Sequence, residues 1–144
     1  MRYMVILAVA FTAAAVACSD STGPEVEPYP DVAGSYAFQG DLDDPFCFND
    51  AIRGTLTLTQ ESRSESSLGG TADLATTLCD NVLPLNQLMD ASVTQDGQIG
   101  FRLMRPEGES VWAFEGEIEG AGNSLSGTWQ IVGGTSSGTW VAHR

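Results

Sequence analysis

The sequence predicts an all-β domain that folds as an antiparallel, eight-stranded, up-and-down barrel, with a β-sandwich as the alternative. Successive short segments alternate apolar and polar residues with a period of two, which is the pattern of half-buried strands. No stretch carries a long helical period, and sixteen glycines gather at turns and at inward strand positions. The connections between segments are short, which favours an up-and-down order. Closing the last strand on the first would leave no sheet edge exposed.

Residues 109–144 carry the clearest pattern, which predicts three successive strands separated by glycine-rich turns. In the first strand, apolar residues beginning at Trp112 alternate with glutamates. The next two segments repeat the alternation around Trp129 and Trp140. We therefore expect all three tryptophans of the chain to lie on one inner surface.

The N-terminal half predicts three further strands, at residues 32–40, 52–59 and 68–74. The first places Tyr36 and Phe38 on the same face, and the second is rich in leucine, isoleucine and threonine, which favour strands. Gly69 and Gly70 predict a bend or bulge in the third strand.

Residues 75–90 form the least regular stretch because Pro84 divides their apolar residues. Proline suits the first turn of a helix, so a short helix is expected to begin near Pro84. Two strands follow, at residues 91–95 and 98–104, and the Asp-Gly pair at 96–97 between them is a strong hairpin signal.

The first seventeen residues have the features of an export signal, with a positive start at Arg2, an apolar run and small residues at the end. Residues 15–17, Ala-Val-Ala, directly precede Cys18, and this arrangement resembles the lipobox of bacterial lipoproteins. The resemblance implies that Cys18 is lipidated after cleavage and anchors the protein to a membrane. Ser19 after the cysteine implies passage to the outer membrane. An ordinary cleaved secretory signal is the alternative.

The chain therefore divides into a lipoprotein signal peptide (residues 1–17), a lipid anchor with a flexible, proline-containing tether (18–30) and a β-barrel domain (31–144). Lipidation of Cys18 would leave Cys47 and Cys79 as an even pair in an oxidising compartment. We expect these two cysteines to form a disulfide, with the reduced pair as the alternative.

The charge of the chain argues against nucleic acid as a partner. Nineteen acidic and six basic residues give a formal net charge of −13, which should repel phosphate backbones and anionic lipid headgroups. Glu115, Glu117 and Glu119 lie two residues apart and so project from one face of a strand. We interpret this acidic face as a device for solubility rather than a pair of catalytic carboxylates.

No catalytic, metal or cofactor site is predicted, and we expect the protein not to be an enzyme. Residues 134–138 match the GxSxG pattern of hydrolases, but they lack the strand-to-helix context that this motif needs. The single histidine, His143, is predicted on an outer face, where a Ser-His-acid arrangement would be hard to build. Four aspartates in residues 41–50 lack the spacing of a calcium loop.

The inward aromatic side chains are the candidate binding site that remains. Eight-stranded barrels are at the size where side chains either fill the interior or leave room for one small ligand. The glycine-x-aromatic triplets that end at positions 36, 129 and 140 loosely resemble the triplet that opens avidin and lipocalin barrels, which implies the barrel architecture alone. The candidate ligand-binding residues are Tyr36, Phe38, Phe101, Trp112, Phe114, Trp129 and Trp140.

Two functional hypotheses follow from these patterns. The first is a non-enzymatic, lipid-anchored bacterial envelope protein that acts as an interaction or structural module, with an exposed apolar patch around Leu83, Leu85 and Leu88 for an envelope partner. The alternative is a carrier of a small apolar ligand held inside a lipocalin-like barrel, with residues 78–89 as a lid.

Overall fold

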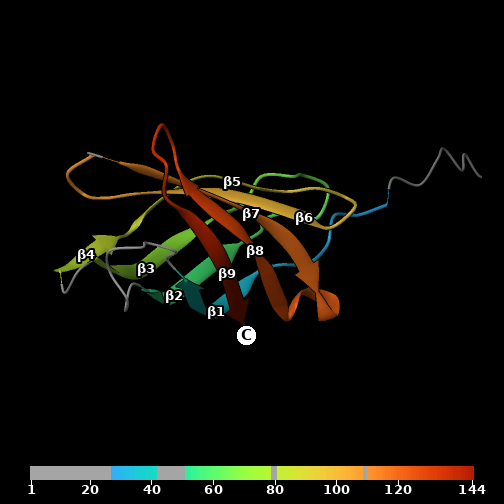
Figure 1. The fold of residues 1–144 in the computed structure, drawn as a ribbon. Helices are drawn as coiled ribbons and strands as arrows, with labels where there is room; N and C mark the ends of the chain where they lie inside the picture. Colours follow the sequence, from blue (N-terminus) through green and yellow to red (C-terminus); the bar gives the residue numbers. More distant parts are fainter. Residues whose placement is uncertain (1–26, 42–50, 79–80, 109) are drawn as a thin grey trace, which may run out of the picture.

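The chain folds into one antiparallel sheet of nine strands that curls into a nearly closed, up-and-down barrel, which confirms the predicted architecture. The computed structural model describes residues 27–41, 51–78, 81–108 and 110–144. In Figure 1, β5, β6 and β7 lie across the sheet formed by β1 to β4, and β8 and β9 join the two halves. The elements are β1 (Gly34–Asp41), β2 (Ala51–Thr59), β3 (Gly69–Leu78), β4 (Asn81–Leu85), β5 (Gln87–Val93), β6 (Gln98–Met104), β7 (Val111–Glu119), the 3-10 turn η1 (Gly120–Gly122), β8 (Ser124–Ile131) and β9 (Ser137–His143).

The strands follow the order β4-β3-β2-β1-β9-β8-β7-β6-β5, so the first strand pairs with the last and the two edges are β4 and β5. These edge strands are neighbours in the chain, separated by Asn86, and their antiparallel partners make them run in the same direction. The pairs Leu74↔Leu85 and Ser67↔Ser92 belong to one continuous register. Residues 81–93 thus act as one kinked closing strand, which explains why nine strands form where the sequence predicts eight.

The short helix predicted near Pro84 is wrong, because this residue lies inside β4 and is paired in register with Ala75 of β3. Proline lacks the amide hydrogen that a central strand needs, and β4 tolerates it because it is an edge strand. In the segment predicted as a lid, residues 81–85 and 87–89 therefore belong to strands of the barrel wall. The next strand also begins earlier than predicted, at Gln87 instead of residue 91.

A bulge in β5 accompanies this kink. The register between β5 and β6 shifts between Met89 and Ser92, and Asp90 between them has a positive φ of 50°. A bulge inserts an extra residue and bends its strand. Beyond this bulge, Ser92 pairs with Ser67, just before β3.

Two Gly-Thr-Trp triplets pair with each other in the centre of the sheet. Thr128 lies opposite Thr139, so Trp140 is opposite Gly127 and Trp129 is opposite the glycine of the other triplet. The indole of Trp140 lies against the backbone of its partner strands and donates from Nε1 to the Thr128 carbonyl oxygen at 3.0 Å. Trp129 covers Gly138 and Trp140 covers Gly116 of β7, so a side chain at either glycine would collide with the indole, as aromatic residues lie over strand glycines.

One end of the barrel is closed by the C-terminal arginine. The hydroxyl of Tyr36 lies 2.9 Å from the carbonyl oxygens of both Val32 and Gly122, and it accepts a hydrogen bond of 3.2 Å from Arg144 Nε. The guanidinium carbon lies 5.3 Å from the centre of the Tyr36 ring, within range of a cation–π interaction. These contacts link the start of β1 to the β7–β8 connection and to Arg144.

Candidate functional site

The seven aromatic residues predicted as a ligand-binding set all lie inside the barrel, each at most 3% exposed. All of them come from β1, β6, β7, β8 and β9. The buried apolar side chains of β2 to β5 are all aliphatic and form what we call the aliphatic wall, while β6, β8 and β9 add aliphatic side chains beside their aromatic rings. The residues of the aliphatic wall are Ile52, Leu56, Leu58, Ala72, Leu74, Leu85, Ala91 and Val93.

The aromatic rings contact one another in two groups. Phe101 and Phe114 stack with ring centres 4.9 Å apart, and Phe38 stacks on Trp140 at 5.4 Å. These two pairs meet edge to face, the geometry that aromatic quadrupoles favour. Trp112 and its neighbour Trp129 stack separately at 4.8 Å, while the seventh ring, Tyr36, lies at the end closed by the arginine.

One polar residue of this interior was not predicted from the sequence. Thr76 on β3 is fully buried, and it is the one buried polar side chain among the core residues that the structure describes. Its Oγ1 has no hydrogen-bond partner. The alternation that places Ala72 and Leu74 inward could have identified it, but the predicted strand stops at Leu74.

The polar atoms of the interior tyrosine and tryptophans are all hydrogen bonded. Trp129 Nε1 donates to the Asp41 carbonyl oxygen at 3.0 Å, and Trp112 Nε1 donates to Ser110 Oγ at 3.3 Å. Trp140 and Tyr36 are paired with backbone carbonyl groups as described above. Burial raises the pKa of the Tyr36 hydroxyl, an effect that the neighbouring Arg144 partly opposes.

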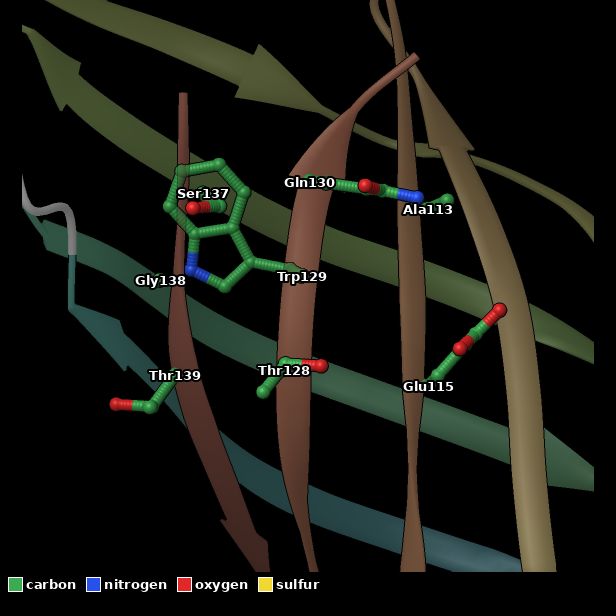
Figure 2. A pocket seen from close by; sticks show the side chains of 8 residues that line it. All are labelled: Ala113, Glu115, Thr128, Trp129, Gln130, Ser137, Gly138 and Thr139. Atoms are coloured by element: carbon green, nitrogen blue, oxygen red, sulfur yellow. The ribbon is translucent and has the colours of Figure 1, made fainter. Parts of the chain in front are cut away.

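A hollow of about 460 Å³ lies on the outer face of β7, β8 and β9. Figure 2 shows Gln130 extending toward Ala113 across the strands. Hydroxyl, amide and carboxylate groups surround the hollow, but Trp129 is only 1% exposed and offers little ring surface. Its lining residues are Ala113, Glu115, Thr128, Trp129, Gln130, Ser137, Gly138 and Thr139.

A second hollow, of about 510 Å³, lies at the end of the barrel where the N-terminal segment crosses it. Tyr29 N donates to the Arg63 carbonyl oxygen at 2.9 Å, and Arg63 Nε donates back to the Tyr29 carbonyl oxygen at 2.8 Å. Gln95 Nε2 donates to the Glu27 carbonyl oxygen at 2.9 Å. Residues 27–30, which the sequence assigns to the tether, therefore contact the domain.

The structure contains a serine–histidine pair that the sequence did not suggest. Ser124 Oγ lies 3.0 Å from His143 Nδ1, and the two residues face each other across β8 and β9. Glu119 is opposite Ser124 on β7, but its carboxylate accepts a hydrogen bond from Ser126. The residue opposite His143 on β1 is Ala37, so no acid orients the imidazole from that side as a catalytic triad requires.

The apolar patch predicted from the sequence is not found. Leu85 is fully buried, and Leu83 and Leu88 are partly buried, so the exposed apolar patch expected around these three leucines is wrong.

Within the described ranges, no cluster of three histidine, cysteine or acidic residues forms a metal site, and no helix is long and apolar enough to cross a membrane. Three predicted sites, Cys18, Cys47 and Cys79, lie outside the described residues, as does most of the acidic segment 41–50.

Comparisons with known proteins support the fold. No protein-family model matches the sequence, and no curated protein matches it. Among solved structures, the chain is similar to a redesigned β-barrel, mFAP1, bound to DFHBI, with a TM-score of 0.59 at 14% sequence identity. The match covers 78% of this chain and 94% of that chain. At this identity the similarity shows a shared β-barrel fold.

Proposed function

We propose that the protein is a non-enzymatic, lipid-anchored envelope protein whose barrel binds a small apolar molecule in its interior. The observation that carries this proposal is the division of the interior into an aromatic wall and an aliphatic wall. Apolar walls with few polar groups are typical of small-molecule sites. The similar barrel mFAP1 was solved with DFHBI bound, which supports ligand binding by a barrel of this fold.

Titration of the mature, detergent-solubilised protein with 2-naphthol tests this proposal. Because all three tryptophans lie in the interior, a molecule that enters it should quench tryptophan fluorescence in a saturable manner. Ala72→Leu on β3 adds bulk to the inner wall and should weaken binding, whereas Ala75→Leu adds the same bulk to the outer face and should not. Unchanged fluorescence in the unsubstituted protein would exclude an apolar interior site for this probe.

A second candidate function is attachment to another envelope component through the outer surface. The hollow over β7, β8 and β9 favours it, because no intramolecular hydrogen bond engages its polar side chains Thr128, Gln130 and Thr139. A photo-crosslinking residue at Thr139 should then capture a partner in cells that the same residue at Thr71, an exposed threonine of β3, does not capture. Equal capture at both positions would argue against a specific surface.

Lipid anchoring remains a proposal that rests on the resemblance of residues 15–18 to a lipobox. Cells fed radioactive palmitate should label the protein, and the Cys18→Ser variant should lose both the label and its fractionation with outer membranes. Labelling that persists in the variant would show that another residue carries the lipid.

The proposed disulfide between Cys47 and Cys79 has its own test. Exported protein treated with an alkylating reagent before and after reduction should gain two labels only after reduction. Two labels without reduction would show that both thiols are free.

A further inference from the structure

Thr76 is the one fully buried polar residue of the described core; the partly buried Gln60 also has an unpaired amide nitrogen, but its Oε1 accepts a hydrogen bond from Val32 N. The indole nitrogens of all three tryptophans and the hydroxyl of Tyr36 have hydrogen-bond partners, whereas Thr76 Oγ1 is buried without one. Buried hydroxyls are normally paired, because an unpaired one loses its hydrogen bonds to water and gains none in return. The free protein is therefore less stable than it would be with an apolar side chain at this position.

Folding does not explain the choice of threonine here. Thr76 lies between Ile52 of β2 and Leu83 of β4 in the sheet register, and its inward neighbour on β3 is Leu74. Valine has nearly the same shape and an equally high strand propensity, and it carries no hydroxyl to satisfy. An unpaired buried hydroxyl in an apolar wall instead suits a ligand site, because a bound ligand can supply the missing hydrogen-bond partner.

We propose that Thr76 Oγ1 is the polar anchor of the interior site and that the bound molecule carries one uncharged oxygen, a hydroxyl or a carbonyl, on an apolar body. This inference rests on the proposed function. A neutral oxygen is required because burial of a carboxylate without a counter-charge is costly. Two arginines lie near the described core, and both are engaged: Arg144 donates to Tyr36 at the end of the barrel, and Arg105 is paired with Glu107.

The matched probes 2-naphthol and 2-methylnaphthalene test this anchor, because they differ only in a hydroxyl or a methyl group. The unsubstituted protein should bind 2-naphthol about 5- to 10-fold more tightly, the usual size of one net hydrogen bond. Thr76→Val should remove this preference, and Thr76→Ser, which keeps the hydroxyl, should retain it. Thr71→Val, an exposed substitution on the same strand, is the control and should leave the preference unchanged.

The possible outcomes separate this inference from the proposed function. If both probes bind and Thr76→Val keeps the preference for 2-naphthol, the interior site stands and the Thr76 anchor is wrong. If neither probe binds the unsubstituted protein, the proposed function fails and the anchor fails with it. The free Thr76→Val protein should also unfold at an equal or higher urea concentration, and a marked fall in that midpoint would show that the hydroxyl already has a partner.

Discussion

At the scale of single residues, Tyr36 and Arg144 decide how one end of the barrel is held. The Tyr36 hydroxyl lies within hydrogen-bond distance of two carbonyl oxygens from distant parts of the chain, and it also accepts a hydrogen bond from Arg144. Because Val32 and Gly122 are buried, their carbonyl oxygens would lose this partner away from water if the Tyr36 hydroxyl were removed. The network therefore joins the first strand to the last residue, and a substitution that removes the Tyr36 hydroxyl should lower the free energy of unfolding.

Tyr36→Phe should lower the free energy of unfolding by about 1–3 kcal/mol, the typical cost of leaving buried polar groups unpaired. Urea denaturation followed by tryptophan fluorescence measures this change. Tyr29→Phe is the control, because the hydrogen bonds of Tyr29 in the structure are made by its backbone. Equal losses in the two variants would contradict the role assigned to the Tyr36 hydroxyl.

Stability should also fall at high pH because burial raises the pKa of Tyr36 above its usual value near 10. The unfolded chain then releases the phenolic proton at a lower pH than the folded chain does. The contribution of the neutral hydroxyl is therefore complete below about pH 10 and is lost as pH rises through the folded-state pKa. The urea midpoint should drop above pH 10 by less in Tyr36→Phe than in the unsubstituted protein, and parallel curves would contradict this.

At the scale of elements, the paired Gly-Thr-Trp triplets of β8 and β9 set the packing of the aromatic wall. A side-chain carbon added at Gly127 would collide with the backbone of Glu115 and Gly116, because β7 lies directly beside it. At Gly116 the same addition would come within 2.7 Å of the Trp140 ring. Gly116 therefore leaves space for the Trp140 indole, and Gly127 allows the backbone of β7 to lie close.

Gly127→Ala should destabilise the barrel by about 1–3 kcal/mol, as overpacked core positions do. Gly100→Ala on β6 is the matched control, since the added carbon would meet its nearest atom, the Phe114 carbonyl oxygen, at an ordinary distance of 3.8 Å. Thermal unfolding of the two variants measures the difference. A Gly127→Ala protein as stable as the control would show that the strands can move apart without loss.

The sequence predicted most of the strands because their alternation is regular. β6 was predicted with its observed bounds, and the faces of β7, β8 and β9 follow from the positions of the three tryptophans. β4 was missed because Pro84 interrupts it and because apolar residues point to both of its sides. Such an edge strand lacks the period of two that a half-buried strand shows.

The site was predicted less completely than the fold, because cross-strand register is not visible in a single sequence. The seven interior aromatic residues could be named from alternation alone. The pairing of Ser124 with His143 and the reciprocal placing of Gly127 and Trp140 depend on register, which only the assembled sheet defines. Thr76 escaped notice because a threonine in a strand is ordinary until its burial is known.

At the scale of the whole molecule, the barrel brings an aromatic wall and an aliphatic wall together around one interior. The wall opposite the tryptophans is closed by a kinked strand, residues 81–93, whose two parts pair with different neighbours. The glutamates of β7, Glu115, Glu117 and Glu119, are exposed on the outside of the barrel. We therefore expect the affinity for a ligand to depend on the interior side chains and very little on the outer surface.

A crystal structure of the mature protein grown with 2-naphthol tests this account most directly. The account predicts the naphthol rings inside the barrel, between the two walls, with the naphthol oxygen within hydrogen-bond distance of Thr76 Oγ1. Rings found in the hollow over β7 to β9 or in the hollow at the end of the barrel, with the interior side chains undisturbed, would contradict it.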